Sequence, residues 1–460
     1  MNYTINILCI GGGYVGGPTM SMIALKCHYC KVTIVDINKD RIDQWNSNSL
    51  PIYEPGLHEI VISRRGKKLF FLTDIENGIK EADIIFVAVN TPTKEFGVGA
   101  GMATDLQYWE KTARQILEYS ESSKIVVDKS TLPVKTAQAM ERILSVNNNE
   151  VRFEVLSNPE FLAEGTAVKD LLTPDRVLIG SQETKEGLKA RKVLVDIYSN
   201  WVPEDKILTS NIWSSELSKL VANAFLAQRV SSINSISALC EITNSDIDEV
   251  AMAVGMDNRI GSKFLKASIG FGGSCFKKDI LNLVYICKSY GLSEVAEYWE
   301  NVVNINIYQQ EQERFVIEII KSMFNTLAGR KIVLFGSAFK ANTDDTRESP
   351  ALFIARRLLQ EKANLVISDP RALKNSKKSL ENIKGSVAYI EDPYEATIAC
   401  HAIIVCTEWE IYSKLDYNRI YNNMVKPTFF FDGRNIVDRK NLYKIGFNVF
   451  SIGKPALTHF

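Results

Sequence analysis

The residues most able to do chemistry lie together in the decapeptide 270–279, which reads Gly-Phe-Gly-Gly-Ser-Cys-Phe-Lys-Lys-Asp. Its glycines allow the backbone to approach a ligand closely, because they carry no Cβ. Cys275 follows them, and the ammonium groups of Lys277 and Lys278 favour its thiolate form. The carboxylate of Asp279 lies four residues beyond the thiol. The pattern predicts a nucleophilic cysteine rather than a buried structural one.

A second chemical signal is a glycine-rich turn near the N-terminus. The apolar run 5–10 leads into Gly11-Gly12-Gly13-Tyr14-Val15-Gly16, a helix-like stretch follows at 19–25, and a second apolar run, 32–35, precedes Asp36. This order of strand, glycines, helix, strand and acid is typical of a dinucleotide-binding βαβ unit. The Asp36 carboxylate can bind the adenosine ribose hydroxyls and would repel a 2′-phosphate. The turn therefore predicts NAD rather than NADP.

Two further apolar runs must place polar loops at the same edge of the sheet. Residues 82–89 lead into Asn90-Thr91-Pro92-Thr93, and residues 124–128 lead into Lys129-Ser130-Thr131-Leu132-Pro133. Continuous apolar strands are expected in a parallel sheet whose two faces are both covered, and ligands meet the loops at the carboxyl ends of such strands. We therefore expect both loops to line the cofactor site.

A long helix is predicted over residues 213–242, which contain neither Gly nor Pro. Apolar residues such as Leu217, Leu220 and Ala224 recur at helical spacing along it. Unbroken, such a helix measures on the order of 45 Å and commonly links domains. Lys219 and Asn223 are four residues apart and therefore share one of its faces.

The C-terminal third repeats the pattern of the N-terminal domain. Residues 331–336 and 365–370 read as strands on either side of an amphipathic helix over 349–361, and the run 402–407 resembles the earlier run 84–89. This unit has no GxGxxG, so we expect it to hold a different ligand. The predicted fold is α/β, with two Rossmann-like doubly wound domains joined by a long central helix. We place the domains at 1–212 for NAD, 213–325 for the helical region with the cysteine loop, and 326–460 for the second Rossmann-like unit with its different ligand.

Composition excludes several classes of function. The 54 basic residues balance 54 acidic ones, so no global field recruits nucleic acid or an anionic membrane. No apolar run approaches a membrane span, and the chain enters its first strand without a signal-peptide pattern, so we expect a cytoplasmic protein.

The eight cysteines are too sparse for a disulfide scaffold. Cys27 and Cys30 have CxxC spacing without a second pair, and no metal site is expected.

These segments together closely resemble the UDP-glucose/GDP-mannose dehydrogenase family, and within it the UDP-glucose type. The resemblance extends from residues 11–16 through the motifs at 50–57, 158–165 and 270–279 to those at 338–340, 345–349 and 431–434. Several such motifs in the same order are highly specific. Asp128 and Ser337 are small departures, since relatives often carry Glu at the first position and an apolar residue at the second.

The resemblance implies a role for each matched residue. It makes Cys275 the nucleophile and assigns the rest of the catalytic group to Lys219, Asn223, Asp279, Glu160 and Thr131. The NAD environment would comprise Gly11, Gly12, Gly13, Tyr14, Val15, Gly16, Asp36, Arg41, Val89, Asn90, Thr91, Pro92, Thr93, Ser130, Thr131, Leu132, Glu164 and Arg347. The sugar nucleotide would contact Glu160, Phe161, Leu162, Ala163, Glu164, Lys219, Asn223, Lys266, Ala267, Ser268, Ile269, Gly270, Phe271, Gly272, Phe339, Lys340, Arg434 and, donated by a neighbouring subunit, Arg259. A homodimer at least, and by resemblance a hexamer built as a trimer of dimers, is implied.

The chemistry of the implied reaction agrees with these residues. Oxidising the primary alcohol of UDP-glucose to the acid of UDP-glucuronate removes four electrons, so two NAD molecules are reduced in turn. Addition of the Cys275 thiolate to the intermediate aldehyde gives a thiohemiacetal, which a second oxidation converts to a thioester. Lys219 and Asn223 can stabilise the oxyanions, and Asp279, acting through water, is a candidate base. None of the four histidines lies within a site motif, so a histidine-based mechanism is not expected.

Two alternatives stay open from the sequence. A related dehydrogenase for GDP-mannose or a UDP-N-acetyl hexosamine would share the fold and the chemistry, although the Phe339-Lys340 pair and the Phe264-Leu265-Lys266 loop favour the UDP-glucose type. The second alternative is a non-catalytic scaffold that binds NAD without turnover. The intact Cys275 argues against this alternative.

Overall fold

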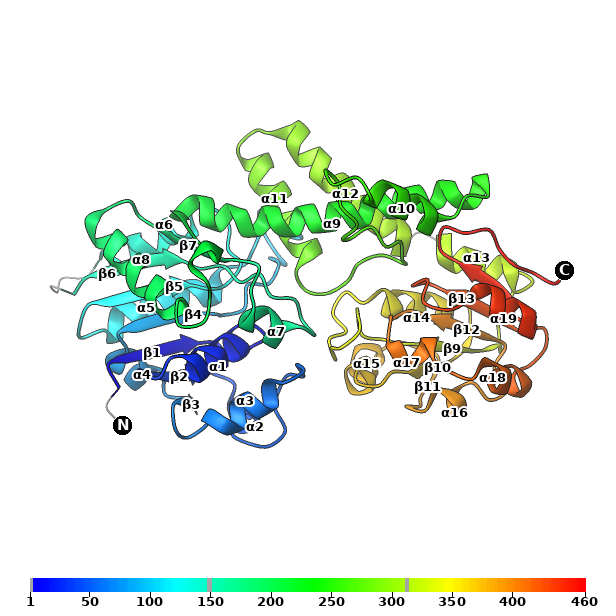
Figure 1. The fold of residues 1–460 in the computed structure, drawn as a ribbon, viewed down its shortest axis with the longest axis horizontal. Coiled ribbons are helices and arrows are strands. Elements are labelled where there is room, and N and C mark those ends of the chain that lie inside the picture. The colour runs from blue at the N-terminus through cyan, green and yellow to red at the C-terminus, as the bar shows by residue number, and fades with distance from the viewer. Residues whose placement is uncertain (1–2, 147–150, 311–313) are drawn as a thin grey trace. The chain divides into compact units, whose positions relative to one another are not determined.

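The computed structural model describes residues 3–146, 151–310 and 314–460. The chain divides into two compact units, one made of residues 1–222 and 281–292 and the other of residues 223–280 and 293–460. Each unit is built around one β-sheet with helices packed against it (Figure 1). The predicted α/β class with two Rossmann-like domains and a long central helix is confirmed.

The sheet of the first unit has eight strands in the order β3-β2-β1-β4-β5-β6-β7-β8. All neighbouring strands are parallel except β6 and β7, which are antiparallel. The strands are β1 Ile5–Ile10, β2 Cys30–Val35, β3 Leu69–Leu72, β4 Ile84–Val87, β5 Lys124–Asp128, β6 Phe153–Ser157, β7 Val177–Ser181 and β8 Ile207–Asn211. The helices are α1 Gly16–Lys26, α2 Lys39–Trp45, α3 Leu57–Arg64, α4 Ile75–Glu81, α5 Gln107–Tyr119, α6 Thr136–Leu144, α7 Ala167–Leu172 and α8 Lys185–Tyr198, with a 3-10 turn at Glu204–Lys206.

Burial explains why the central strands of this unit are apolar along their whole length. All four residues of β4 are buried, and so are the last four of β1. Two apolar clusters cover the two faces of the sheet, one containing Trp45 and the other Trp109. Because both faces are covered, the polar residues of these segments are confined to the strand ends, where the loops begin.

The second unit carries a six-stranded, fully parallel sheet in the order β11-β10-β9-β12-β13-β14. Its strands are β9 Lys331–Phe335, β10 Asn364–Ser368, β11 Ser386–Tyr389, β12 Ala402–Val405, β13 Phe429–Asp432 and β14 Asn448–Ser451. The helices that accompany them are α14 Pro350–Gln360, α15 Leu373–Leu380, α16 Pro393–Ala396, α17 Glu410–Ser413, α18 Tyr417–Asn423 and α19 Arg439–Ile445.

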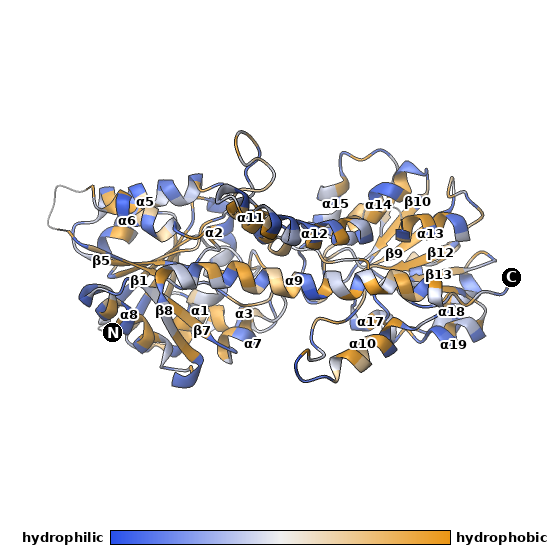
Figure 2. Cartoon of the chain, turned by 90° about the horizontal axis from the view of Figure 1, so that it is seen from above, coloured by the Kyte–Doolittle hydropathy of each residue, from blue (hydrophilic) through white to orange (hydrophobic). Residues whose placement is uncertain are grey.

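A mainly helical stretch lies between the two sheets in the sequence. It consists of α9 Ile212–Thr243, α10 Ile247–Gly255, α11 Phe276–Ser289, α12 Ser293–Gln310 and α13 Arg314–Ser322. The predicted long helix is therefore one residue longer at each end than expected. Figure 2 shows apolar and polar residues intermixed along α9. Among the described residues, no helix combines the length and the apolar character that crossing a bilayer requires.

Candidate active site

The glycine-rich turn after β1 has the geometry that a dinucleotide requires. Gly11 has φ +112°, and a Cβ there would lie 2.3 Å from the Ala88 carbonyl oxygen. A Cβ on Gly16 would lie 2.0 Å from the Gly11 oxygen, whereas one on Gly13 would meet no protein atom within 4 Å. Gly11 and Gly16 are therefore required by close backbone packing, and Gly13 leaves room beside the backbone for a ligand.

The start of α1 suits a phosphate. Its N-cap residue, Val15, offers no side-chain cap, and its first turn has no acidic residue. The amide groups and positive dipole end of such a helix favour an anion. The turn therefore fits the pyrophosphate of a dinucleotide, as the sequence predicts.

Asp36 lies just beyond the carboxyl end of β2 and is already engaged with the turn. Its Oδ2 accepts hydrogen bonds from the Gly12 amide and from Arg41 Nη1, both at 2.9 Å, and its Oδ1 accepts one from the Asn38 amide. These hydrogen bonds fix the Asp36 carboxylate beside the glycine-rich turn 11–16. Arg41 places a positive charge directly beside the Asp36 carboxylate, and this pairing was not predicted from the sequence.

The two polar loops at the ends of β4 and β5 contact each other. Ser130 Oγ donates to the Val89 carbonyl at 2.9 Å, and Thr91 Oγ1 donates to the Thr131 carbonyl at 3.3 Å. These bonds bring the predicted segments 89–93 and 130–132 together at one edge of the sheet.

The segment after β6 holds four of the predicted substrate residues, Glu160 to Ala163. Glu160 Oε1 accepts hydrogen bonds from the amides of Phe161 and Leu162, at 2.9 and 3.1 Å. The Arg176 guanidinium lies 3.9 Å from the centre of the Phe161 ring, and Lys219 Nζ lies 5.4 Å from it. The structure thus brings Lys219 to the Glu160 segment. Glu164, half-buried, continues this segment.

Cys275 immediately precedes α11 and is exposed, whereas the seven other cysteines are buried and none of the eight forms a disulfide. The amino-terminal end of a helix carries partial positive charge, which stabilises a negative charge placed there. Lys277 forms an ion pair with Glu348 at 3.0 Å, and Lys278 Nζ lies 3.8 Å from Asp279 Oδ1. Cys275 is therefore the cysteine that a substrate can reach.

Asp279 lies in the first turn of α11, four residues after Cys275. Its backbone amide donates to the Cys275 carbonyl at 2.8 Å, and its Oδ2 accepts a 2.6 Å hydrogen bond from Asn223 Nδ2. Both side chains are buried. The predicted group of Cys275, Asn223 and Asp279 is thus brought together within the second unit.

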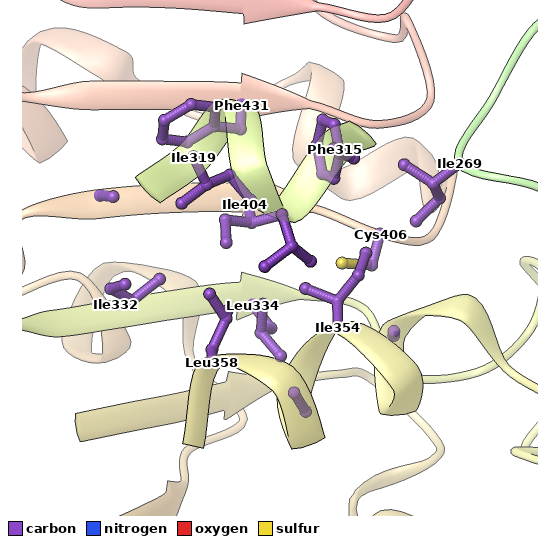
Figure 3. Close-up of a cluster of buried hydrophobic side chains, with 14 of the residues drawn as sticks. Ile269, Phe315, Ile319, Ile332, Leu334, Ile354, Leu358, Ile404, Cys406 and Phe431 are labelled. Atoms are coloured by element: carbon purple, nitrogen blue, oxygen red, sulfur yellow. The ribbon is translucent and has the colours of Figure 1, made fainter. Parts of the chain in front are cut away.

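The loop 266–272 before the cysteine is held by polar side chains from the helices around it. The Ser268 amide donates to Asn234 Oδ1 of α9, and the Phe271 amide donates to Asn306 Oδ1 of α12, at 2.9 and 2.8 Å. Residues 267–271 are buried, and Lys266 is exposed. Ile269 is fully buried at one side of the apolar cluster of the second unit, near Phe315 and Cys406 (Figure 3). The loop is therefore rigidly anchored.

The predicted residues of the C-terminal domain lie next to this loop. A Cβ on Gly272 would lie 2.4 Å from the Glu348 carbonyl, and the Gly273 amide donates to the Arg347 carbonyl at 2.9 Å. Arg434 Nη2 donates to the Phe339 carbonyl at 2.9 Å. The neighbouring Lys340 has its Nζ 5.5 Å from the Phe339 ring, so these residues form one patch with the loop.

Arg259 pairs with a residue of its own loop in the second unit. Its side chain is 89% exposed, and it pairs with Asp257 at 2.6 Å. By resemblance, Arg259 is expected in the site of a neighbouring subunit, and this stays a prediction.

Several residues with evident positioning roles were missed in the sequence. Lys129 forms a buried ion pair with Glu160, and Asn234 and Asn306 fix the cysteine loop. Arg229 donates to three carbonyls of the segment that carries Arg259. Nothing in the local sequence separates Asn234, Asn306 and Arg229 from ordinary helical residues. The lysine directly before Ser130 was the one detectable signal, since a charge at the end of a buried strand needs a partner.

Cys27 and Cys30 are buried neighbours. Both thiols are fully buried and lie beside each other, and this contact raises the pKa of Cys27 and lowers that of Cys30. Within the described ranges, no cluster of three His, Cys, Asp or Glu side chains could bind a metal ion.

Comparison with known families matches almost the whole chain to one of them. The three models of the UDP-glucose/GDP-mannose dehydrogenase family match in order. They are its NAD binding domain at residues 5–202, its central domain at residues 213–308 and its UDP binding domain at residues 333–439.

Curated relatives include UDP-glucose 6-dehydrogenase 5 of Oryza sativa and UDP-glucose 6-dehydrogenase 4 of Arabidopsis thaliana. Each is 56% identical over 98% of this chain and 97% of its own length. Among solved structures, a UDP-glucose dehydrogenase from the archaeon Pyrobaculum islandicum is 31% identical, with a TM-score of 0.85 and 99% of both chains covered. A UDP-D-ManNAc dehydrogenase from Pyrococcus horikoshii, at 24% identity and a TM-score of 0.80 over 98% of this chain and 99% of its own, shares the fold.

Proposed function

This chain belongs to the UDP-glucose/GDP-mannose dehydrogenase family, and we propose that it oxidises UDP-glucose to UDP-glucuronate through a covalent intermediate on Cys275. The 56% identity to UDP-glucose 6-dehydrogenases extends over 98% of the chain, so the chain is an NAD-dependent oxidoreductase that acts on UDP-glucose. The mechanism below and its residues are our proposal.

One observation carries the mechanism: Cys275 is the exposed cysteine, and it lies at the amino-terminal end of α11 beside Asp279. Its Sγ adds to the carbon of the aldehyde that the first oxidation produces, and the carbonyl oxygen takes a proton. The aldehyde is then held as a thiohemiacetal and can neither hydrate nor leave. The second oxidation leaves a thioester, whose C–S bond breaks when water attacks, which returns the thiol.

The surrounding side chains have distinct roles in this scheme. Asn223 and Lys219 stabilise the oxyanions that form at the reacting carbon. Asp279 accepts protons through water, and its hydrogen bond from Asn223 keeps the carboxylate in place. Glu160 and Thr131, both in the first unit, are assigned to the catalytic group by the resemblance to the family.

The NAD site assigned here uses the turn 11–16, Asp36 and the loops 89–93 and 130–132. Bound NAD supplies the hydride acceptor for each of the two oxidations. Gly13 leaves space beside the pyrophosphate path, Asp36 binds the ribose, and the uncapped end of α1 neutralises phosphate charge. Glu164 and Arg347 complete the proposed NAD environment.

The sugar nucleotide is assigned to the second unit and to the Glu160 segment. Loop 266–272, Phe339, Lys340 and Arg434 form the patch that we propose for the UDP-sugar. The UDP binding domain model covers the C-terminal part of this patch, and UDP-sugar binding is thereby supported. The division into domains at 1–212, 213–325 and 326–460 stays a prediction. It is supported by the order of the family models, which match residues 5–202, 213–308 and 333–439.

We propose that the working protein is at least a homodimer and that its dimers form a hexamer. Apolar side chains of α9 are exposed in the single chain, Leu239 at 56% and Ile242 at 82%. Burying such residues against a second copy removes apolar surface from water. Arg259 would then reach the partner's substrate. The cytoplasmic location expected from the sequence likewise stays a prediction.

Product analysis tests the proposed function. The purified protein is incubated with NAD and, separately, UDP-glucose, GDP-mannose and a UDP-N-acetyl hexosamine. We expect UDP-glucuronate, with two NADH formed per molecule of product. Faster turnover of either other sugar nucleotide would favour the related dehydrogenases, and binding of NAD without any product would favour a scaffold.

A further inference from the structure

A buried lysine lies behind the segment that we assign to the substrate. We propose that Lys129 is a positioning residue: its ammonium holds the Glu160 carboxylate and, through it, the Phe161 and Leu162 backbone in register with the cofactor loop that begins at Ser130. The inference rests on the proposed function for the role of these segments, and it deepens that function by naming the residue that aligns them.

The environment of Lys129 accounts for every donor of its ammonium group. Its side chain is 3% exposed, and Nζ lies 2.9 Å from Glu160 Oε2. Nζ also donates to Asn158 Oδ1 at 3.0 Å and to the Tyr198 hydroxyl at 3.2 Å. An ammonium has three donors and no acceptor, so Lys129 is fully satisfied within the protein. It has no donor left for a substrate and can act only through its partners.

Glu160 connects three separate parts of the first unit. Its Oε2 forms an ion pair with Lys129, which directly follows β5, and accepts a 3.3 Å hydrogen bond from Thr19 Oγ1 of α1. Its Oε1 accepts hydrogen bonds from the backbone amides of Phe161 and Leu162. One carboxylate therefore fixes the backbone of its own loop relative to the strand and the helix that build the cofactor site.

The backbone of Lys129 is hydrogen-bonded to the end of β4, next to the proposed cofactor loops. The amides of Lys129 and Ser130 both donate to the Val87 carbonyl at the end of β4, at 3.0 and 3.2 Å. Ser130 Oγ donates to the Val89 carbonyl at 2.9 Å. A displacement at Lys129 would therefore be transmitted both to the cofactor loop and, through Glu160, to the substrate segment.

The charge on Lys129 matters as well as its shape. Burial alone would raise the pKa of Glu160, but the Lys129 ammonium and the loop amides outweigh it and lower that pKa. Burial likewise opposes the charge on Lys129, yet Glu160 and Tyr198 leave its pKa raised. The titratable groups that face Lys129 are Glu160, Tyr198 and the Cys9 thiol. Removing the ammonium would leave the Glu160 carboxylate, which is only 14% exposed, without its counter-charge, and this is unfavourable.

Lys124, at the other end of β5, is a matched control. It is also 3% exposed, and its Nζ donates to the carbonyls of Lys80 and Ala82 and to Ser122 Oγ. No carboxylate is among these three partners. Lys124→Met therefore removes a buried lysine from the same strand without touching Glu160.

Amide hydrogen exchange, followed by mass spectrometry on peptides covering residues 158–165, tests the positioning directly on the full-length protein. We expect Lys129→Met to speed exchange at Phe161 and Leu162 by about tenfold or more, because opening of a local structure controls such exchange. Lys124→Met should leave these peptides unchanged. Unchanged exchange in Lys129→Met, or an equal increase in both variants, would overturn the inference. Since this measurement needs neither substrate nor turnover, it is independent of the proposed function.

Kinetics supply the second measurement. We expect Lys129→Met to lower kcat by about tenfold or more and to move the acid limb of its pH profile to higher pH, because Glu160 loses the cation that lowers its pKa. Lys124→Met should stay within about twofold of the wild type. The double variant Lys129→Met/Glu160→Gln should be no slower than Glu160→Gln alone, because Lys129 acts through Glu160. Losses that multiply, or an unmoved pH profile, would contradict the inference.

Discussion

Asn223 donates a 2.6 Å hydrogen bond from its carboxamide to Asp279 Oδ2, and both side chains are buried. The bond joins α9 to the first turn of α11, the helix that Cys275 immediately precedes. The position of the Asp279 carboxylate relative to the thiol is therefore set by a side chain of the long helix as well as by its own backbone. This arrangement fixes the carboxylate in the helical turn that follows Cys275, the residue that we propose as the nucleophile.

Asp279→Asn should slow the reaction while leaving the fold intact. The substitution preserves the shape of the side chain and removes its capacity to accept a proton, so we expect kcat to fall by about 100-fold. NAD affinity should not change, because the turn 11–16 lies in the other unit. Steady-state kinetics with UDP-glucose check this, with Glu294→Gln, an exposed carboxylate of α12, as the control. A kcat equal to that of the control would show that Asp279 moves no proton.

Asp36→Ala should narrow the preference for NAD over NADP. The carboxylate that repels a 2′-phosphate is lost, and Arg41, which it holds at 2.9 Å, becomes available to bind that phosphate. We expect the ratio of kcat/KM for NAD to that for NADP to fall by about tenfold or more. In the double variant Asp36→Ala/Arg41→Ala, any increase in kcat/KM for NADP that Asp36→Ala produces should be lost. An unaltered ratio in Asp36→Ala would show that cofactor choice is made elsewhere.

The order of elements could be read from the sequence because each depends on a local pattern. The run at residues 5–10 and the glycines after it predict a strand and a turn by their own chemistry, and the structure has β1 at those residues. The long helix was predictable from the absence of Gly and Pro in residues 213–242.

Contacts between distant segments could not be predicted in the same way. Lys129 and Glu160 are 31 residues apart, and their ion pair exists because β5 and β6 are adjacent in the sheet. Asn306 is not marked by any motif, and only the fold shows that it holds the Phe271 backbone. The pairing of Asp36 with Arg41 was missed although the residues are close in sequence, because the direction of a side chain depends on the loop that carries it.

Asp128→Asn should change how stability depends on pH. Burial, with a smaller contribution from Glu216, raises the pKa of Asp128 from 3.8 to about 8. The folded protein therefore keeps a proton that the unfolded chain loses between about pH 4 and 8, so the free energy of unfolding falls as pH rises, by up to about 1.4 kcal/mol per pH unit. Asn is neutral throughout and keeps an acceptor for Trp109 Nε1, which donates to Asp128 Oδ1 at 3.0 Å.

Denaturant titrations at pH 6 and pH 8 measure this difference. The decline in unfolding free energy should be smaller in Asp128→Asn than in the wild type. It should not vanish, because burial also raises the pKa of Glu216 to about 7 and so contributes with the same sign. Equal declines in the two proteins would mean that Asp128 is ionised in the folded state across this range.

Arg259→Ala should be inactive alone and rescued in part by mixing. If Arg259 serves the partner's substrate, a heterodimer of Arg259→Ala and Cys275→Ser contains one complete site, and some activity should return after subunit exchange. Arg259 is 89% exposed in the single chain, so the substitution should not disturb folding. Exchange verified by native mass spectrometry without recovered activity would contradict the shared site, as would a fully active monomer.

The most direct measurement of the proposed chemistry is the mass of the protein during turnover. The wild type is mixed with UDP-glucose and NAD, quenched in acid within the first turnovers, and digested, so that the peptide containing Cys275 can be weighed. We predict a UDP-glucuronyl thioester on that peptide and no adduct on the buried Cys287 of α11. In Cys275→Ser, which should still bind NAD, we predict neither adduct nor UDP-glucuronate. UDP-glucuronate formed by Cys275→Ser at the wild-type rate, or steady wild-type turnover with Cys275 always unmodified, would contradict the covalent mechanism.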